Sequence, residues 1–377
     1  MTEVSPARLV LEDAWGHSSE PVSLGWAPGR CTVVGEHVDY AGGVVVAIAI
    51  NLGVEVAVRG AASGYRVVSA GRRVERSDTQ PRGDIGDRIL AAVEALRVRG
   101  FSFPGLDIGV SANLPESAGL SSSAAVVCAT LLALLRHADA TLGSDELFAA
   151  ALYAERDVVG VPCGPLDQLT IVNAQPASAA ILDCRDNSVT TVPWPWHDVA
   201  IVAAASGESH DVGGDGYRTR REQAAEVMRQ LDLVDVQAVD LNIVEQLDEP
   251  LRRRGRHLVS ETKRAQLAML AFESGDAARL GELMSASHRS LRDDYEVSTA
   301  RLDSIVGAAL GVDGCWGARL CGAGFGGTAI ALVKRDSAAA CATAMAAAAG
   351  SDPRTSTWTF EPSAGMAALY PQNVVSR

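Results

Sequence analysis

The chain has 377 residues and carries 33 lysines and arginines against 46 aspartates and glutamates, which gives a formal net charge of −13. This length predicts one or two sizeable hydrophobic cores, and the negative balance argues against nucleic acid as a partner. Hydrophobic residues make up 47% of the chain, but apolar runs such as Val44 to Ile50 are too short to cross a bilayer, which argues against a membrane protein.

The amino terminus and the cysteines both favour a cytoplasmic protein. Residues 1–15 contain acidic side chains where a signal peptide would have a basic and then an apolar segment. The seven cysteines are widely spaced and never form a CxxC pair, so they predict buried thiols and neither a disulfide framework nor a zinc ribbon. They are Cys31, Cys128, Cys163, Cys184, Cys315, Cys321 and Cys341.

Strands and helices alternate in the first half of the expected structure. The β-rich segment 44–58, which Gly53 interrupts, predicts paired strands. Apolar spacing predicts a helix over 84–97 and a strand over 106–110, and hydroxyl residues before a long apolar run predict a buried helix over 121–136. The remaining predicted elements of this half are a helix over 145–159 and strands over 169–172 and 179–184.

The segment Pro193 to Trp196, with the sequence Pro-Trp-Pro-Trp, breaks both patterns. We therefore expect an N-terminal domain over residues 1–195 and a C-terminal domain over residues 196–377. The elements expected in the second domain are a strand over 199–205, a glycine-rich loop over 213–216, a helix over 217–231, further helices to about 310, a glycine-rich turn over 322–327, a strand over 328–334, a helix over 337–349 and a strand over 355–360.

The chain has one short basic run, Arg252-Arg253-Arg254-Gly255-Arg256, which lies near Glu261 and Lys263. Such a run could form a nucleic-acid patch or the solvated face of a helix. In an acidic chain with mixed charges nearby, the sequence favours the solvated face.

Residues 114–125, LPESAGLSSSAA, form a loop of small residues that runs straight into the predicted helix. Unpaired N–H groups at the positive end of a helix bind phosphate, and the three hydroxyls add further donors, one of which can ligate Mg²⁺. The spacing is not that of a Walker A loop, because no GxxxxGK[ST] pattern is present. The alternative is an ordinary helix capped by serine.

Residues 27–40, APGRCTVVGEHVDY, bring an arginine, a glutamate, a histidine and an aspartate within ten positions. Alternation along a strand sends neighbours to opposite faces, so Glu36 and His37 are poorly placed to share one metal ion. Hydrogen bonding to a polyhydroxylated ligand suits these side chains better, and a salt-bridged surface turn is the remaining alternative.

Residues 160–168, GVPCGPLDQ, put Asp167 after a Gly-Pro turn with apolar neighbours. These surroundings suit a base or positioning group at the wall of a cleft, although an aspartate that caps a turn has the same pattern.

Residues 322–327, GAGFGG, contain the GxGxxG pattern of dinucleotide-binding folds. That pattern requires a helix directly afterwards, whereas residues 328–333 predict a strand, so we reject a Rossmann site. A glycine turn between strands instead lets the backbone approach a ligand or another segment closely.

Together these segments resemble the galactokinase family, part of the superfamily that also contains homoserine, mevalonate and phosphomevalonate kinases. The resemblance rests on four motifs in the family's order, namely APGRCTVVGEHVDYAGG, LPESAGLSSSAA, VGVPCGPLDQ and LCGAGFGG, and runs from about Trp26 to beyond Lys334. Flanking matches are Asp183-Cys184-Arg185, Tyr217 in GYRTRREQ, His257 with Glu261 and Arg264, and SHRSLRDDYEVS.

The resemblance implies a two-domain α+β small-molecule kinase fold with the active site in the cleft between the domains. It implies an enzyme that uses ATP and Mg²⁺ to phosphorylate the anomeric hydroxyl of a monosaccharide, with galactose to galactose 1-phosphate as the expected reaction. The implied roles are catalysis by Asp167 and Arg30; sugar contacts from Glu36, His37, Asp39, Gly164 and Tyr217; nucleotide contacts from Gly119, Leu120, Ser121, Ser122 and Ser123; and Mg²⁺ ligation by Ser123 and Glu155.

The chemistry leaves open whether Asp167 takes the hydroxyl proton or only orients the hydroxyl. Phosphoryl transfer has a loose, charge-dispersed transition state, so positioning and a cation matter more than base strength. Arg30 is expected to lower the pKa of the hydroxyl and to offset negative charge.

Several positions depart from the usual family pattern. They are Thr32, Val38, Ala41, Ser117, Arg156, Pro165, Leu166 and the segment 211–214. These departures keep open two alternatives to a galactokinase: an anomeric kinase for another sugar, such as an amino or deoxy sugar, a pentose or a uronic acid, and a catalytically silent sugar sensor. Retention of Arg30, Ser123, Glu155 and Asp167 together argues against the sensor.

Overall fold

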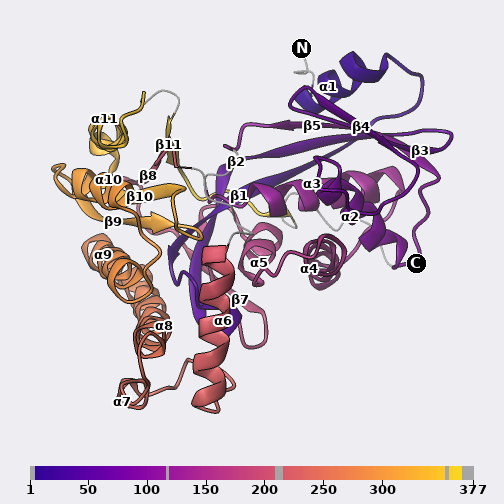
Figure 1. The fold of residues 1–377 in the computed structure, drawn as a ribbon. Helices are drawn as coiled ribbons and strands as arrows, with labels where there is room; N and C mark the ends of the chain where they lie inside the picture. Colours follow the sequence, from indigo (N-terminus) through magenta and orange to yellow (C-terminus); the bar gives the residue numbers. More distant parts are fainter. Residues whose placement is uncertain (1–4, 116–118, 209–214, 353–355, 367–377) are drawn as a thin grey trace.

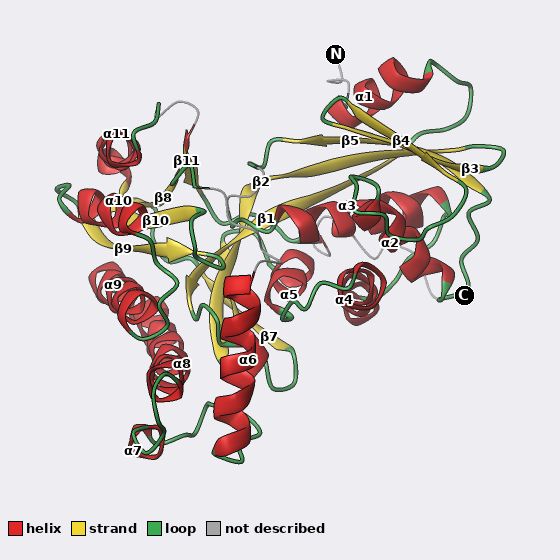
Figure 2. Ribbon diagram, viewed as in Figure 1, coloured by secondary structure: helices red, strands yellow, loops and turns green. Residues whose placement is uncertain are grey.

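The computed structural model describes residues 5–115, 119–208, 215–352 and 356–366. Within these ranges the chain forms two β-sheets, one of seven strands and one of four, with helices packed against both (Figure 1 and Figure 2). The strands of the larger sheet all precede residue 195 and those of the smaller sheet all follow it. The mixed α+β architecture agrees with the sequence prediction, whereas the division into domains at residue 195 stays a prediction.

The larger sheet has the strand order β4-β3-β5-β2-β6-β7, with β1 paired to β2. Its pairs are antiparallel except β3 with β5, which run parallel. The strands are β1 (Ser23–Val34), β2 (Val44–Gly60), β3 (Gly64–Ser69), β4 (Arg72–Arg76), β5 (Gly105–Ala112), β6 (Ser178–Asp183) and β7 (Ser188–Pro193). A short 3-10 helix, η1 (Asp39–Ala41), lies in the turn from β1 to β2.

Strand β2 is the centre of this sheet and differs from its prediction. The expected break at Gly53 is wrong, because β2 is one continuous strand of 17 residues. Gly53 lies opposite Pro28 of β1, and a Cβ atom at Gly53 would meet the Ala27 carbonyl oxygen at 2.3 Å. This glycine therefore permits close approach of β1 rather than a turn. The register of β1 against β2 shifts between Pro28 and Arg30, and such bulges re-aim side chains.

Helices cover both faces of the larger sheet. Figure 1 shows α1 (Pro6–Trp15) on one side, and α2 (Asp87–Arg97) and α3 (Ser122–His137) on the other. The predicted buried helix over 121–136 is confirmed as α3, whose apolar side chains from Ala124 to Leu135 are almost all buried. The predicted helix over 145–159 is α4 (Ser144–Tyr153), which continues as a π-helical turn, η2 (Ala154–Val159).

The strand predicted over 169–172 is wrong, because these residues lie in helix α5 (Leu166–Asn173). A short, fully buried apolar run has no polar face, so periodicity cannot separate strand from helix there. The local chemistry favours the helix, since Pro165 stands at its N-cap and Asp167 in its first turn. The correction matters for the site, because Asp167 projects from a helix N-terminus rather than from a turn before a strand.

The smaller sheet is antiparallel with the order β11-β8-β10-β9. Its strands are β8 (Val199–Ala205), β9 (Cys315–Cys321), β10 (Thr328–Lys334) and β11 (Thr357–Phe360). Because a strand, β10, follows the glycine-rich turn, the rejection of a Rossmann site is confirmed. The helices of this half are α6 (Asp215–Gln230), α7 (Leu241–Val244), α8 (Leu251–Ser274), α9 (Ala277–Asp293), α10 (Ala300–Leu310) and α11 (Ala338–Ala349), with a 3-10 turn η3 (Arg335–Ser337). The predicted glycine-rich loop 213–216 falls partly outside the described residues.

The basic run at the start of α8 is ion-paired rather than uniformly solvated. Arg252 and Arg253 both bind Glu249 at 2.9 and 3.0 Å, and Arg256 binds Glu245 at 2.8 Å. Arg254 is 2% exposed and pairs with Glu296. The prediction of a fully solvated face is therefore wrong at Arg254, and the paired charges give no support to a nucleic-acid patch.

All seven cysteines are free thiols, as predicted. Four of them are buried, but Cys163, Cys184 and Cys315 are only partly so. Among the described residues, no helix combines the length and the apolar character that a membrane crossing requires.

Close packing of β1 on α3 depends on Gly25. A Cβ atom there would lie 2.1 Å from the Ala129 carbonyl oxygen and 2.5 Å from the Ala133 nitrogen, both on the helix backbone. We expect Gly25→Ala to lower the free energy of unfolding by about 2–3 kcal/mol, because backbone must move. Gly307→Ala is the control, since Gly307 in α10 has no heavy atom within 4 Å of that position. Urea denaturation of both variants measures the difference, and an unchanged Gly25→Ala midpoint would contradict this packing.

Candidate active site

A cleft of about 730 Å³ collects residues from both halves of the chain. It is lined by every residue assigned a role from the sequence except Leu120. Those residues are Arg30, Glu36, His37, Asp39, Gly119, Ser121, Ser122, Ser123, Glu155, Gly164, Asp167 and Tyr217. The structure thus brings the four sequence motifs to one place, with Gly322 and Ala323 representing the fourth.

Arg30 connects several segments of the cleft through hydrogen bonds. It is 6% exposed, and its Nε and Nη2 atoms each lie 2.7 Å from Asp167 Oδ1, while Nη1 donates to the Gly119 carbonyl at 2.6 Å. Burial alone would lower the pKa of the guanidinium, but the carboxylates of Asp167 and Glu36 raise it above its ordinary value. Arg30 is therefore a permanent cation that contacts both Asp167 and the small-residue loop before α3, which we call the phosphate loop after its predicted role.

The phosphate loop has a backbone unsuited to ordinary capping. Gly119 and Ser121 both have positive φ, 68° and 61°, and the left-handed conformation of a serine marks a strained position. Ser121 is the N-cap residue of α3 but makes no capping hydrogen bond, and its buried Oγ has no partner among the described residues. This observation disfavours the alternative of a plain serine-capped helix. Ser117 lies outside the described residues.

Leu120 contributes through its backbone instead of lining the cleft. Its side chain is 1% exposed, and its carbonyl accepts the Arg30 N–H at 3.1 Å. The phosphate loop also touches the fourth motif, because a Cβ atom at Gly119 would meet the Cys321 carbonyl oxygen at 2.7 Å. Glycine is needed at position 119 both for this approach and for its positive φ.

Glu155 sits in the π-helical turn η2, and such turns occur frequently at functional sites. It is 2% exposed and accepts hydrogen bonds from Gln168 Nε2 and from the Ser123 side chain. Burial, reinforced by the nearby charge of Asp167, raises the pKa of Glu155 to about 7, although Arg88 opposes the shift. The pair Ser123 and Glu155 presents hard oxygen donors side by side, as a Mg²⁺ ion would require.

Arg88 is a cleft residue that the sequence did not reveal. It lies in the first turn of α2, lines the cleft, and its Nε atom is 3.6 Å from Glu155 Oε1. The residues around Arg88 in the sequence form helices well and have ordinary amphipathic spacing. An arginine in such a segment predicts only the solvent-exposed face of a helix. Nothing in the local pattern could have singled it out.

Asp39 lies in the 3-10 turn after β1 and is 9% exposed. Burial raises its pKa to about 6, and the charges of Asp167 and Glu36 add to the shift. Gly164 packs directly against it, since a Cβ atom at Gly164 would lie 1.6 Å from Asp39 Oδ2. Glycine at 164 therefore leaves room for the Asp39 carboxylate at the cleft wall.

His37 has a positive φ of 63° and both ring nitrogens engaged. Nε2 donates to the Ala323 carbonyl at 3.0 Å, so in the neutral ring Nδ1 accepts from the Tyr40 hydroxyl at 2.9 Å. Burial lowers the pKa of His37 to about 3. The ring of Tyr217 lies 5.9 Å from that of His37, and the two form part of an aromatic wall with Tyr40 and Tyr295.

Most departures from the family pattern do not face the cleft. Thr32, Val38 and Ala41 are buried, and Val38 and Ala41 belong to a hydrophobic core cluster. Arg156 donates to the Cys163 carbonyl at 2.8 Å. Of the departing residues that the structure describes, Leu166 is the one that lines the cleft. The segment 211–214 lies outside the described residues.

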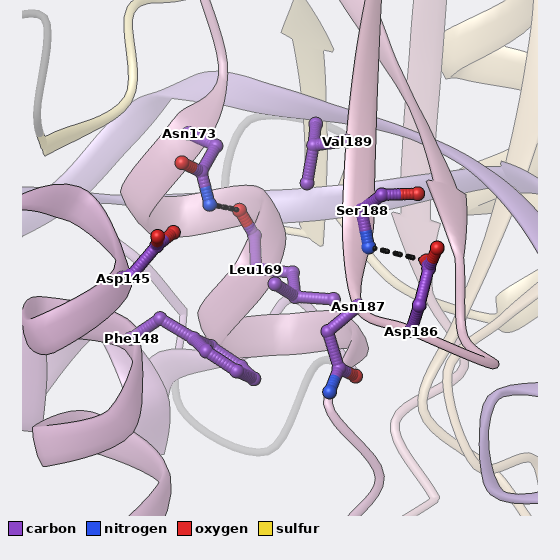
Figure 3. Close-up of a pocket in the computed structure, with 8 residues that line it drawn as sticks. All are labelled: Asp145, Phe148, Leu169, Asn173, Asp186, Asn187, Ser188 and Val189. Carbon is purple, nitrogen blue, oxygen red and sulfur yellow. Dashed lines mark hydrogen bonds between the residues drawn. The ribbon is translucent and has the colours of Figure 1, made fainter.

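A second cavity, of about 450 Å³, lies between α4, α5 and the β6–β7 hairpin (Figure 3). Asp145 and Phe148 line it from α4, and Asn173 closes it from α5 by donating to the Leu169 carbonyl at 3.0 Å. None of the residues assigned a role from the sequence lines it. The chemistry therefore belongs to the larger cleft.

Three family models match the chain. "GHMP kinases N terminal domain" matches residues 87–175, "GHMP kinases C terminal" matches residues 268–352, and "Galactokinase galactose-binding signature" matches residues 12–60. The fold also aligns with a mevalonate kinase structure at a TM-score of 0.67 and 17% identity, over 90% of this chain and 98% of the other. Fold and cleft together define a GHMP-type small-molecule kinase.

Closer relatives narrow the class. The chain is 38% identical to a galactokinase of Roseiflexus sp. over 82% of its own length and 83% of the relative, and 36% identical to one of Chloroflexus aurantiacus over 92% of each. The structure of Lactococcus lactis galactokinase complexed with galactose aligns at a TM-score of 0.87 and 28% identity, over 95% and 98% of the two chains. The chain belongs to the galactokinase family. It is therefore an enzyme, a sugar kinase.

The raised pKa of Asp39 predicts a pH-dependent cost in stability. Between its ordinary pKa and about 6, the carboxyl is protonated in the folded chain but ionised in the unfolded chain, so stability falls as pH rises through this window. Asp39→Asn should raise the free energy of unfolding by about 2–3 kcal/mol above pH 6, with the gain vanishing below about pH 4.

Urea unfolding at pH 4, 5, 6 and 8 measures the effect, with the exposed Asp145→Asn as control for loss of one negative charge. A gain that is equal at all pH values, or equal to that of the control, would contradict a buried titrating carboxyl at position 39.

Proposed function

We propose that this member of the galactokinase family transfers the γ-phosphoryl group of ATP to the anomeric hydroxyl of galactose in the cleft around Arg30. The observation that carries the proposal is the double contact of one guanidinium, with Asp167 at 2.7 Å and with the Gly119 carbonyl at 2.6 Å. It makes the acid and the phosphate loop one hydrogen-bonded unit. An acceptor hydroxyl at Asp167 therefore lies beside a phosphate at the loop.

Asp167 and Arg30 are the proposed catalytic residues. Asp167 orients the sugar hydroxyl and accepts its proton as the new O–P bond forms, because a carboxylate is too weak a base to ionise an alcohol beforehand. Arg30 offsets the charge on the transferring group, which in a loose transition state is spread over the phosphoryl oxygens. The guanidinium group of Arg30 is planar and rigid, so its N–H donors need little rearrangement during phosphoryl transfer.

The proposed sugar contacts lie on the side of the cleft formed by the β1–β2 turn, α5 and α6. Gly164 leaves space for the Asp39 carboxylate, whose oxygens suit sugar hydroxyls. The Tyr217 ring adds an apolar wall to the cleft. Glu36 and His37 complete the set. The related Lactococcus lactis structure, which is complexed with galactose, supports galactose as the sugar. The departing residues Thr32, Val38 and Ala41 do not line the cleft, which supports it further.

We propose that Gly119, Leu120, Ser121, Ser122 and Ser123 hold the nucleotide phosphates and that Ser123 and Glu155 ligate Mg²⁺. The Ser121 hydroxyl, which has no partner among the described residues, and the backbone N–H groups of the first turn of α3 are donors that phosphate oxygens can satisfy. The oxygen pair at Ser123 and Glu155 fits an ion that prefers few protein ligands and keeps water and phosphate in its shell. When bound, Mg²⁺ would neutralise phosphate charge.

Two further expectations remain proposals. A cytoplasmic location, without nucleic-acid or membrane partners, is supported by seven free cysteines, which suit a reducing compartment. A division into domains at 1–195 and 196–377 is supported by the placement of each sheet on one side of that boundary.

The first experiment is ATP turnover with Mg²⁺ against a panel of free sugars, with ³¹P NMR to locate the phosphate. We expect galactose to be the best acceptor and the product to carry an anomeric phosphate. Asp167→Asn should lower kcat by at least about 100-fold, because it removes the proton acceptor, while ATP binding stays near wild type. Turnover by Asp167→Asn at the wild-type rate would reject this residue, and turnover with another sugar alone would reject galactose.

Gly164→Ala should raise KM for galactose by at least about tenfold, because its methyl group would displace the Asp39 carboxylate from the cleft wall. KM for ATP should change little, since position 164 is not among the proposed nucleotide contacts. Gly60→Ala is the matched control, with its nearest neighbour 3.6 Å from the added atom. Equal galactose KM values for the two variants would show that Asp39 does not contact the sugar.

A further inference from the structure

Arg319 is a wholly buried cation at the end of β9 that the proposed mechanism does not use. Its Nη2 atom donates to Glu36 Oε2 at 2.8 Å and its Nε atom donates to the Leu320 carbonyl at 2.8 Å. Its side chain is 0% exposed, and Nη1 has no partner among the described residues. A buried cation with this few partners is costly, so its retention calls for a role.

The Glu36 carboxylate is bound by the protein on one oxygen. The Gly322 N–H donates to Oε2 at 2.9 Å, so both protein donors converge on the same atom. Among the described residues both side-chain hydrogen bonds of Glu36 go to Oε2 and none to Oε1, and Glu36 lines the cleft. The carboxylate is thus anchored through Oε2, which leaves Oε1 to accept a hydrogen bond from a ligand.

The charges around Glu36 come from several elements. Burial raises its pKa, Asp167 raises it further, and Arg319 and Arg30 oppose that shift. The backbone of the same turn is held from α8, where Glu261 accepts the N–H groups of Gly35 and Glu36 at 2.8 and 3.2 Å. The titratable and charged groups that face this region are Arg30, His37, Asp39, Asp167, His257, Glu261, Arg264, Arg319 and Cys321.

We propose that Arg319 is a positioning residue for sugar binding, which holds Glu36 ionised and oriented so that Oε1 accepts a hydrogen bond from a galactose hydroxyl. The inference rests on the proposed function, since it requires Glu36 to face the sugar. An ionised carboxylate is an acceptor only, whereas a protonated one also donates, so the charge state of Glu36 decides which hydroxyl geometry the site can bind. Arg319 therefore acts on the substrate through Glu36 and not by contact.

A purely structural ion pair would behave differently, and the chain offers one for comparison. Arg59 and Asp107 of the larger sheet are 4% and 3% exposed and are joined at 2.9 Å. Neither lines the cleft. Breaking that pair should reduce stability without altering the response of sugar binding to pH.

The experiment measures galactose KM and kcat, ATP KM, and equilibrium galactose binding by calorimetry from pH 6 to 9. The variants are Arg319→Met, Arg319→Lys, Glu36→Gln, the double variant Glu36→Gln with Arg319→Met, and Arg59→Met. For Arg319→Met we expect galactose KM to rise about 10- to 100-fold at pH 7 and to fall toward the wild-type value as pH rises, because loss of the cation that opposes burial raises the pKa of the Glu36 carboxyl further. ATP KM should not change.

Arg319→Lys keeps the cation and should show a smaller rise, which guards against an Arg319→Met variant that fails to fold. The double variant carries no titrating group at position 36, so its galactose KM should be raised and should follow the same pH trend as that of Glu36→Gln. Arg59→Met should lower the melting temperature with galactose KM unchanged and without a new pH trend.

The outcomes separate failure of the inference from failure of the proposed function. No turnover of galactose by the wild-type enzyme would reject the proposed function itself. Wild-type galactose KM in Glu36→Gln would remove Glu36 from the sugar site, and Arg319 with it. A raised galactose KM in Glu36→Gln, combined with an Arg319→Met variant whose KM follows the wild-type pH trend, would make Arg319 purely structural and overturn the inference. Equal losses for both substrates in Arg319→Met would overturn it as well.

Discussion

The pairing of Arg30 with Asp167 is the interaction on which the cleft depends. The two residues are 137 positions apart, one on a strand and one in the first turn of a helix, and each would carry a desolvation penalty of several kcal/mol if buried alone. The same arginine binds the Gly119 carbonyl through its side chain and the Leu120 carbonyl through its backbone. A single residue of β1 therefore fixes the acid relative to the phosphate loop, and the bulge next to it explains how a strand side chain comes to point along the cleft.

The turn that follows β1 is held in place from the other half of the chain. Glu261 accepts two of its N–H groups, and His257 Nε2 lies 3.0 Å from the Glu36 carbonyl and so donates to it. Burial would raise the pKa of Glu261, but Arg264 and its other neighbours lower it to about 2, so this anchor stays charged at any physiological pH. His37 in this turn has a positive φ, a strained conformation that persists only when many surrounding contacts hold it. The proposed sugar side of the cleft therefore depends on helix α8 as well as on the larger sheet.

The sequence motifs predicted which residues line the cleft better than they predicted the helices and ion pairs that hold those residues in place. The four motifs locate Arg30, the serines, Asp167 and the glycine turn, because each has a local chemical signature in small or charged residues. The helix at Asp167 was missed because a short buried apolar run has no period that separates helix from strand. Arg88 and Arg319 carry no signature at all, since their roles arise from partners 67 and 283 positions away, Glu155 and Glu36. Local patterns cannot encode such pairs.

Three carboxyl groups of the cleft are destabilised in their ionised form by the folded chain. Asp39, Glu36 and Glu155 are all nearly buried, and each has a raised pKa for which burial is the first cause and the charge of Asp167 an added one. The cations close to them are Arg30, which is paired with Asp167, Arg319, which binds Glu36, and Arg88, whose Nε atom lies 3.6 Å from Glu155. A bound ligand that donates hydrogen bonds, or brings positive charge, would stabilise the ionised forms and lower these pKa values. Substrate binding and ionisation of the cleft are therefore linked, because a ligand that binds the ionised carboxylates more tightly also stabilises the folded chain.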